Sequence, residues 1–289
     1  MSFKLTLHVH LGKLVLNVHN LWTMLIFYQT KIGLDVLDTS QSHAVLGLAK
    51  ENRPMLELRA SKKEKTNQPH PGLYHFAILL PSRRDLANIL FTMITQKNMD
   101  IQGASDQGFS ESIYLEDPEG NTIELSRDKD PDLWPVLEDG SIPSQTKDLD
   151  VNGVLDEKDV EAYDGLPEGT RLGHIHLMVS DLDQSQHFYQ DQLGFDLKYD
   201  GDGVLFFATG FYHHQLALNA FTTEKCQPLE PGQPGLSSFS LVIDEKESFD
   251  QLLDRLTGLR EVNQVSSTSF KVTDPDGLVI LIEFNSGID

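Results

Sequence analysis

The chain has 289 residues, and its 23 Lys and Arg residues against 44 Asp and Glu residues give a net charge of −21. This length predicts about two domains with ample core, and the charge argues against nucleic acid and anionic membrane surfaces as partners. A single cysteine, Cys226, excludes an intrachain disulfide and gives no sign of an oxidising compartment. No apolar run approaches the roughly 18 to 20 residues of a membrane span. We therefore expect a soluble cytoplasmic protein.

The first predicted element is a strand. Residues 1–18 alternate apolar and polar side chains, which is typical of a strand and not of a secretory signal. The segment 11–36 also aligns without a gap with 172–197, and the segment from Gly72 resembles the segment from Gly235. The chain therefore contains four related repeats. Their opening apolar strands are predicted at Leu14–Val18, Phe76–Leu80, Ile175–Val179 and Phe239–Ile243.

Each repeat continues with a helix and three short strands. In the second repeat we predict strands at Ser112–Leu115 and Thr122–Ser126, joined by an Asp-Pro-Glu-Gly turn at 117–120. In the third repeat Asp181 is suited to cap a helix that ends near Gly194. Strands at Val204–Ala208 and Gln215–Leu218 follow there. One repeat is thus a βαβββ module.

The modules predict an α+β fold divided by a linker. The N-terminal part, 1–126, holds modules 1–68 and 69–126, and the C-terminal part, 171–289, holds modules 171–228 and 229–289. Residues 127–170 form an acidic linker, for which we expect one helix around Val154–Tyr163 and otherwise a course over the surface. Because a four-stranded half-sheet cannot bury both faces, modules should pair into two cup-shaped mixed-sheet barrels.

Four segments carry a resemblance to a known family: Gly72–Pro81 (GLYHFAILLP), Asp117–Leu125 (DPEGNTIEL), Leu172–Leu182 (LGHIHLMVSDL) and Phe211–Asn219 (FYHHQLALN). They resemble the vicinal oxygen chelate superfamily of glyoxalases, bleomycin resistance proteins and extradiol dioxygenases. Within it, the chain is similar to two-domain proteins of the catechol-2,3-dioxygenase type, over its whole length apart from the linker. The superfamily hosts several chemistries on one fold.

The resemblance implies metal ligands on the first strand of one module and on the first and last strands of its partner. The residues in these slots are Lys13, His75, His174 and Ser238 on first strands, and Glu124 and Leu281 on last strands. Pairing the first module with the second, or the third with the fourth, leaves an incomplete site. Pairing the second with the third collects His75, Glu124 and His174, and leaves the first and fourth as a metal-free cup. We expect this pairing.

Two catalytic residues are also implied. Tyr114, ten residues before Glu124, matches a tyrosine that hydrogen-bonds substrate in the family, and His214 matches the acid-base residue of a His-His pair formed with His213. In a regular strand these two histidines project to opposite faces, so only one should face the metal. The chain departs from the family at Gln107, where relatives have a histidine.

The implied function is an extradiol ring-cleaving dioxygenase of aromatic catabolism, acting on a catechol or hydroquinone with O₂. Two histidines and a carboxylate leave about three adjacent positions open on an octahedral ion, which suits Fe(II), although Mn(II) or another divalent metal is compatible. Phe109, Phe206 and Phe211 are candidate walls for the ring. The sequence leaves open whether the chain forms a homo-oligomer.

Two other functions stay open: a different metalloenzyme of the superfamily, such as a glyoxalase-type isomerase or a thiol transferase, and a metal-free small-molecule binding protein. A lone strand histidine is also more often structural than a ligand. Two structural roles are expected elsewhere. Glu57 should pair with Lys13 in the metal-free cup, and the Phe-Tyr pairs at 27–28 and 188–189 should pack helices on sheets.

Overall fold

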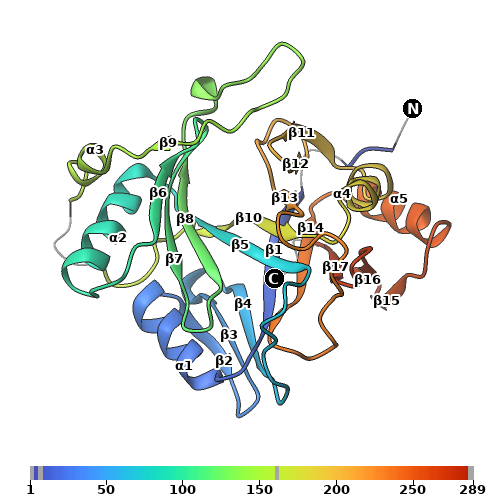
Figure 1. Ribbon diagram of the computed structural model, residues 1–289, viewed down its shortest axis with the longest axis horizontal. Helices are drawn as coiled ribbons and strands as arrows, with labels where there is room; N and C mark the ends of the chain where they lie inside the picture. Colours follow the sequence, from blue (N-terminus) through green and yellow to red (C-terminus); the bar gives the residue numbers. More distant parts are fainter. Residues whose placement is uncertain (1–2, 6–8, 160–162, 286–289) are drawn as a thin grey trace.

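The computed structural model describes residues 3–5, 9–159 and 163–285, and it contains two mixed sheets with helices on their outer sides (Figure 1). One sheet has eight strands in the order β15-β16-β17-β14-β1-β4-β3-β2, and the other has nine in the order β11-β12-β13-β10-β5-β8-β7-β6-β9. We call them the eight-stranded and the nine-stranded sheet. None of the described helices is long and apolar enough to cross a bilayer.

All four modules have the predicted βαβββ order. The first consists of β1 (Val9–Val18), α1 (Leu21–Ile26), β2 (Asp35–Thr39), β3 (His43–Leu48) and β4 (Arg53–Ala60). The second consists of β5 (Gly72–Leu79), α2 (Arg83–Thr95), β6 (Gly103–Asp106), β7 (Ser110–Glu116) and β8 (Thr122–Asp128). The third consists of β10 (Arg171–Met178), α4 (Leu182–Gln186), β11 (Asp196–Gly201), β12 (Val204–Ala208) and β13 (Leu216–Asn219). The fourth consists of β14 (Gly235–Ile243), α5 (Lys246–Thr257), β15 (Asn263–Ser266), β16 (Ser269–Thr273) and β17 (Val279–Phe284).

The modules pair in the nested order that the ligand pattern predicts. Antiparallel pairing of β1 with β14 joins the first module to the fourth, and antiparallel pairing of β10 with β5 joins the third to the second. Of the strand predicted at residues 1–18, the structure describes β1 from Val9, while residues 1–2 and 6–8 lie outside the described residues. Neither sheet is therefore made from one contiguous half of the chain.

Two β-bulges interrupt the pairing of β10 with β5. At the first, Gly173 and His174 together oppose Ala77, and at the second, Tyr74 is an extra residue on β5. A bulge bends the strand and redirects the extra side chain. The first bulge favours glycine, because a Cβ at Gly173 would lie 3.0 Å from the Leu79 Cβ, which is tighter than an ordinary contact. The bulges thus set the directions of the side chains that lie between the two modules.

The two Phe-Tyr pairs do pack helices on sheets, and their tyrosines also tie modules together. Helices α1 and α4 continue as π-helical turns, η1 (Phe27–Ile32) and η4 (His187–Gln192). The buried Tyr28 hydroxyl donates to Asp117 Oδ2 at 2.8 Å, and the buried Tyr189 hydroxyl donates to Asp274 Oδ2 at 2.9 Å. Both acceptors lie in the Asp-Pro turns of the following module. Each tyrosine therefore links the eight-stranded sheet to the nine-stranded sheet.

The linker differs from the prediction in two ways. Its helix, α3 (Val151–Leu155), is shorter and begins earlier than the expected Val154–Tyr163, part of which (160–162) lies outside the described residues. It also does more than follow the surface. Strand β9 (Lys147–Asp148) extends the nine-stranded sheet beside β6, and Ile142, only 2% exposed, packs with Phe109 and Phe206. The reason is that apolar side chains of this acidic segment are buried, Ile142 in this small core and Leu149 and Val154 in the main core.

Candidate metal centre

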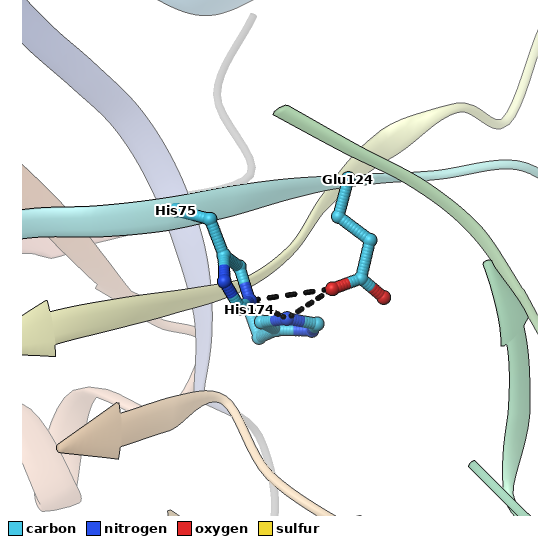
Figure 2. A group of neighbouring side chains, drawn as sticks. All are labelled: His75, Glu124 and His174. Atoms are coloured by element: carbon cyan, nitrogen blue, oxygen red, sulfur yellow. Dashed lines mark hydrogen bonds and ion pairs between the residues drawn. The ribbon is translucent and has the colours of Figure 1, made fainter. Parts of the chain in front are cut away.

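Three side chains from separate strands of the nine-stranded sheet converge on one point (Figure 2). The Nε2 atoms of His75 on β5 and His174 on β10 lie 3.1 Å apart. Glu124 Oε2 on β8 lies 3.2 Å from each of them. His174 and Glu124 are buried, with 4% and 0% of their surface exposed. The structure thus brings together the three residues that the sequence analysis selected as ligands.

Strand pairing explains why these side chains share a face. Strands β5 and β8 are parallel, and Glu124 lies beside Ala77, two residues after His75, so both side chains leave the same side of the sheet. Tyr114 on β7 lies directly opposite Glu124 and joins that side. The bulge at Gly173 directs His174 toward them. His176, two residues further along β10, is not part of this group. Its Nε2 accepts a hydrogen bond from the Asn219 side chain at 2.8 Å.

The donor set fits a divalent cation. Glu124 Oε1 accepts a hydrogen bond from Ser112 at 2.6 Å, whereas the buried Oε2 receives none from any described residue and faces the two imidazoles. Burial alone would raise the pKa of the Glu124 carboxyl, but His174 and His75 hold it well below its usual range. Two ligands about 2.1 Å from one ion lie roughly 3.0 to 3.4 Å apart, depending on the angle between them. The observed triangle has that size.

Tyr114 lies beside this triangle with its hydroxyl held by two polar groups. The Gln107 side chain donates to the Tyr114 hydroxyl oxygen at 2.7 Å, and Ser105 Oγ lies 3.2 Å from it. Burial raises the pKa of Tyr114, and the charge of Glu124 raises it further, so the phenol stays protonated. Gln107, noted from the sequence only as a departure, thus positions the predicted substrate-binding hydroxyl.

His213 and His214 do not lie on a strand, because β13 begins only at Leu216. The regular strand on which the opposite-face argument depended is therefore absent at these two residues. Both are buried, and their Nδ1 atoms lie 2.8 Å apart. The His214 ring centre is 4.2 Å from that of His174. His214 therefore borders the candidate metal centre, and His213 lies behind it.

Two of the three predicted wall residues lie at the site. The Phe206 ring stacks on His214 at 4.3 Å, and the Phe109 ring stacks on His213 at 4.2 Å. Phe211 is wrong as a wall residue: its side chain is 89% exposed, because it lies in a turn directly after Gly210, whose φ is +63°. Phe109 and Phe206 therefore support the histidine pair.

Sequence reasoning missed an aromatic group at the edge of the site. Tyr74, the extra residue of the second bulge, is 44% exposed, and its ring centre lies 4.7 Å from that of His176. The exposed Phe221 ring lies 6.4 Å from the Tyr74 ring. No pattern in a single strand signals a bulge, because it depends on the register with the partner strand.

The corresponding face of the eight-stranded sheet is built differently. Lys13 Nζ donates to Glu57 Oε2 at 2.5 Å, and Arg59 Nε donates to Glu57 Oε1 at 2.6 Å. The predicted Lys13–Glu57 pair is thus confirmed. Among the residues that the structure describes, His75, Glu124 and His174 are the one group that brings three possible metal ligands together.

Comparisons of the sequence with known proteins show the family of the chain. Residues 10–125 and 171–282 match the family model described as glyoxalase/bleomycin resistance protein/dioxygenase superfamily. Catechol-2,3-dioxygenase from Bacillus subtilis is 35% identical over 269 residues, which cover 92% of this chain and 94% of that protein. Metallothiol transferase FosB from Lysinibacillus sphaericus is 32% identical over 124 residues, covering 40% of this chain and 82% of that protein.

Comparisons of the fold find similar solved structures at low sequence identity. The cppA protein from Streptococcus pneumoniae has a TM-score of 0.60 at 11% identity and covers 99% of this chain and 100% of its own. A glyoxalase I variant from Zea mays has a TM-score of 0.58 at 18% identity, covering 96% of this chain and 95% of its own. At such identities the likeness concerns the fold alone.

Proposed function

The chain belongs to the glyoxalase/bleomycin resistance protein/dioxygenase superfamily, and from this premise we propose that it is an Fe(II)-dependent extradiol dioxygenase that cleaves a catechol or hydroquinone with O₂. The observation that carries the proposal is the triangle of His75, His174 and Glu124, in a chain that is 35% identical to a catechol-2,3-dioxygenase along most of its length. Its resemblance to extradiol dioxygenases extends to Tyr114 and His214. The metal identity and the ring substrate are part of the proposal.

His75, His174 and Glu124 would hold the ion. Fe(II) held by two histidines and one carboxylate would have room for further ligands, and it would supply redox chemistry and lower the pKa of a diol bound to it. Zinc would gain less from this arrangement because its preferred coordination is tetrahedral. Mn(II) accepts the same donor set and stays an alternative.

The protein side chains would accept the proton, hydrogen-bond the substrate and exclude water. Burial lowers the pKa of His214 well below its usual value, so its imidazole is neutral and can accept a proton from the diol. Its Nδ1 faces His213, which leaves Nε2 as the accepting atom. The protonated Tyr114 hydroxyl can donate to a substrate oxygen. Phe109, Phe206 and Ile142 exclude water behind the histidine pair.

The test is to load the protein with Fe(II) under anaerobic conditions and then add O₂ and a panel of catechols and hydroquinones. The proposal predicts O₂ uptake with a yellow ring-cleaved product, at a ratio of one to one. The His174→Ala variant should lose both the iron and the activity. An iron-loaded protein that turns over none of these diols would contradict the proposal, and activity only with Mn(II) would contradict the choice of iron.

A thiol transferase is the second candidate, because FosB is 32% identical over 124 residues. A glyoxalase-type isomerase is disfavoured, because the chain has His213, His214 and Gln215 where such a site would need a second carboxylate ligand. Thiol consumption by the Mn(II)- or Ni(II)-loaded protein, without O₂ uptake, would favour the transferase. A small-molecule binding protein is distinguished by elemental analysis, since it would carry no stoichiometric metal.

A further inference from the structure

We propose that Asp128 is a positioning residue: through His213 it fixes the tautomer of His214, so that His214 presents the unprotonated Nε2 to the substrate. This inference rests on the proposed function and deepens it. Asp128 is the last residue of β8, the strand that also carries Glu124. It lies far from His213 in the sequence, and nothing in the linear pattern connects the two.

The contacts form a chain of three short links. Asp128 Oδ1 lies 3.0 Å from His213 Nε2, and His213 Nδ1 lies 2.8 Å from His214 Nδ1. The second carboxylate oxygen, Asp128 Oδ2, accepts a hydrogen bond from the Tyr212 hydroxyl at 2.9 Å. Both oxygens of Asp128 are therefore engaged, and the carboxylate is held in one orientation.

These links determine where the protons lie. An ionised carboxylate only accepts hydrogen bonds, so His213 must carry its proton on Nε2. Burial lowers the pKa of His213 in spite of the nearby Asp128, so the ring is neutral and its Nδ1 has a lone pair. Between the two facing Nδ1 atoms one must donate, and His214 is then the donor. His214 therefore keeps its lone pair on Nε2, the atom that a general base needs.

Packing prevents the rings from turning to another arrangement. His213 stacks on Phe109 at 4.2 Å and 14°, and the edge of Trp134 lies against it, with ring centres 5.0 Å apart. His214 stacks on Phe206 at 15°. The linker residue Trp134 is itself fixed by a hydrogen bond from its indole to the Lys129 carbonyl at 2.9 Å. With orientation fixed by packing, the proton positions are left to Asp128.

The alternative role for Asp128 is purely structural, and the two roles have different consequences. If Asp128 sets the tautomer, its replacement should lower kcat while the KM for diol and the iron content stay close to wild type. In the Asp128→Asn variant the new side-chain amide can turn toward His213 Nε2 and donate. This would reverse the donor and acceptor in each hydrogen bond from position 128 to His214 and so place the His214 proton on Nε2. If Asp128 only stabilises the loop, iron binding, KM and thermal stability should change together.

The experiment compares Asp128→Asn and Asp128→Glu with wild type. We expect a fall in kcat of roughly 10- to 100-fold for Asp128→Asn, with partial recovery in Asp128→Glu. Asp196→Asn is the matched control, because Asp196 is also a partly exposed carboxylate of the same sheet, ion-paired with Lys4 and, at 4.0 Å, with Lys198, and it lies outside the site. It should leave kcat unchanged. An unchanged kcat in Asp128→Asn would overturn the proposal, as would a parallel loss of iron.

Nitrogen-15 NMR of histidine-labelled, metal-free protein gives a readout that needs no turnover. Wild type should show His213 protonated on Nε2 and His214 on Nδ1, and Asp128→Asn should show both reversed. A wild-type spectrum with His214 protonated on Nε2 would overturn the proposal even without the variants. If instead the wild-type and variant tautomers are as expected and the protein oxidises no diol, the role of Asp128 in setting the tautomers is supported and the dioxygenase assignment fails.

Discussion

The two sheets present nearly the same backbone with different side chains. Register breaks between Leu11 and Leu14 and between Val15 and Leu16 interrupt β1–β14, just as the two bulges interrupt β10–β5. At the aligned ligand positions the eight-stranded sheet carries Lys13, Ser238 and Leu281 in place of His174, His75 and Glu124. The comparison shows that the module backbone orients three side chains toward one another, whereas the identity of those side chains decides whether an ion can bind.

The eight-stranded sheet satisfies its own carboxylate without a metal ion. Glu57, 8% exposed, is paired with Lys13 and Arg59. These two cations lower the pKa of Glu57 against the opposing effect of burial. In the nine-stranded sheet Glu124 faces two imidazoles instead. One carboxylate is therefore neutralised by the chain itself, and the other is available to a bound cation.

Removing one carboxylate from each sheet should separate the two roles most strongly. Glu124→Gln should lower the affinity for divalent metal by more than about 100-fold, because it replaces an anionic ligand by a neutral amide. Glu57→Gln should leave metal affinity unchanged. Metal content after dialysis, together with competition by a chelator, measures both. Equal affinities in the two variants would remove the basis for the metal centre.

Substitutions that place the three ligand types in the eight-stranded sheet should create a metal site there. In the Glu124→Gln background, Lys13→His with Ser238→His and Leu281→Glu should recover up to one bound metal per chain, because the bulges already direct these positions together. The control keeps Leu281 and carries only the two histidine substitutions. Recovery by the control as well would show that imidazoles alone suffice. No recovery in the full variant would show that the two backbones differ more than their register indicates.

Burial raises the pKa of the aspartate in both Asp-Pro turns, Asp117 and Asp274, so both turns should respond to pH. Burial raises the pKa of Asp274 to about 6, although Leu278 and Tyr189 donate hydrogen bonds to it. The folded protein then holds this proton more tightly than the unfolded chain, so the stabilisation is complete below about pH 4 and is lost as the pH rises through 6. The advantage of wild type over Asp274→Asn should fall by on the order of 3 kcal/mol across that range.

Urea unfolding of the metal-free proteins between pH 4 and 7 measures this difference. Asp117→Asn is the matched variant in the nine-stranded sheet, where Asn121 gives the carboxylate an additional side-chain donor at 2.8 Å. A constant difference between wild type and Asp274→Asn over the whole range would mean that Asp274 titrates as in the unfolded chain.

The smallest expected effect concerns the tyrosines that link the sheets. Tyr28→Phe and Tyr189→Phe each remove one buried hydrogen bond and leave the ring packing in place, so each should lower the free energy of unfolding by about 1 to 2 kcal/mol. Thermal and urea unfolding measure the loss, and metal content serves as the control, since neither ring contacts the centre. A loss in only one variant would show that the two links are not equivalent.

The sequence predicted what depends on local pattern and on repetition. Four apolar strands, the turn at Asp117 and the cap at Asp181 follow from residues close together in the chain. The nested pairing followed from the ligand slots that the family resemblance implies, because only one combination of modules fills them. Ile142, Trp134 and Asp128 could not be placed this way. Ile142 packs with Phe109 and Phe206, and Trp134 and Asp128 contact His213. These contacts join residues more than 30 positions apart, and neither composition nor periodicity records them.

The nested pairing of modules has a consequence for how the protein is made. While the N-terminal half leaves the ribosome, β1 and β5 both lack the strands that will cover them, because β14 and β10 are translated later. Each is an open sheet edge that can associate with another nascent chain, and contacts so distant in sequence form late in folding. Translation must reach His174 before the three candidate ligands exist together, so any metal ion that this site binds can be held only late in the synthesis of each molecule.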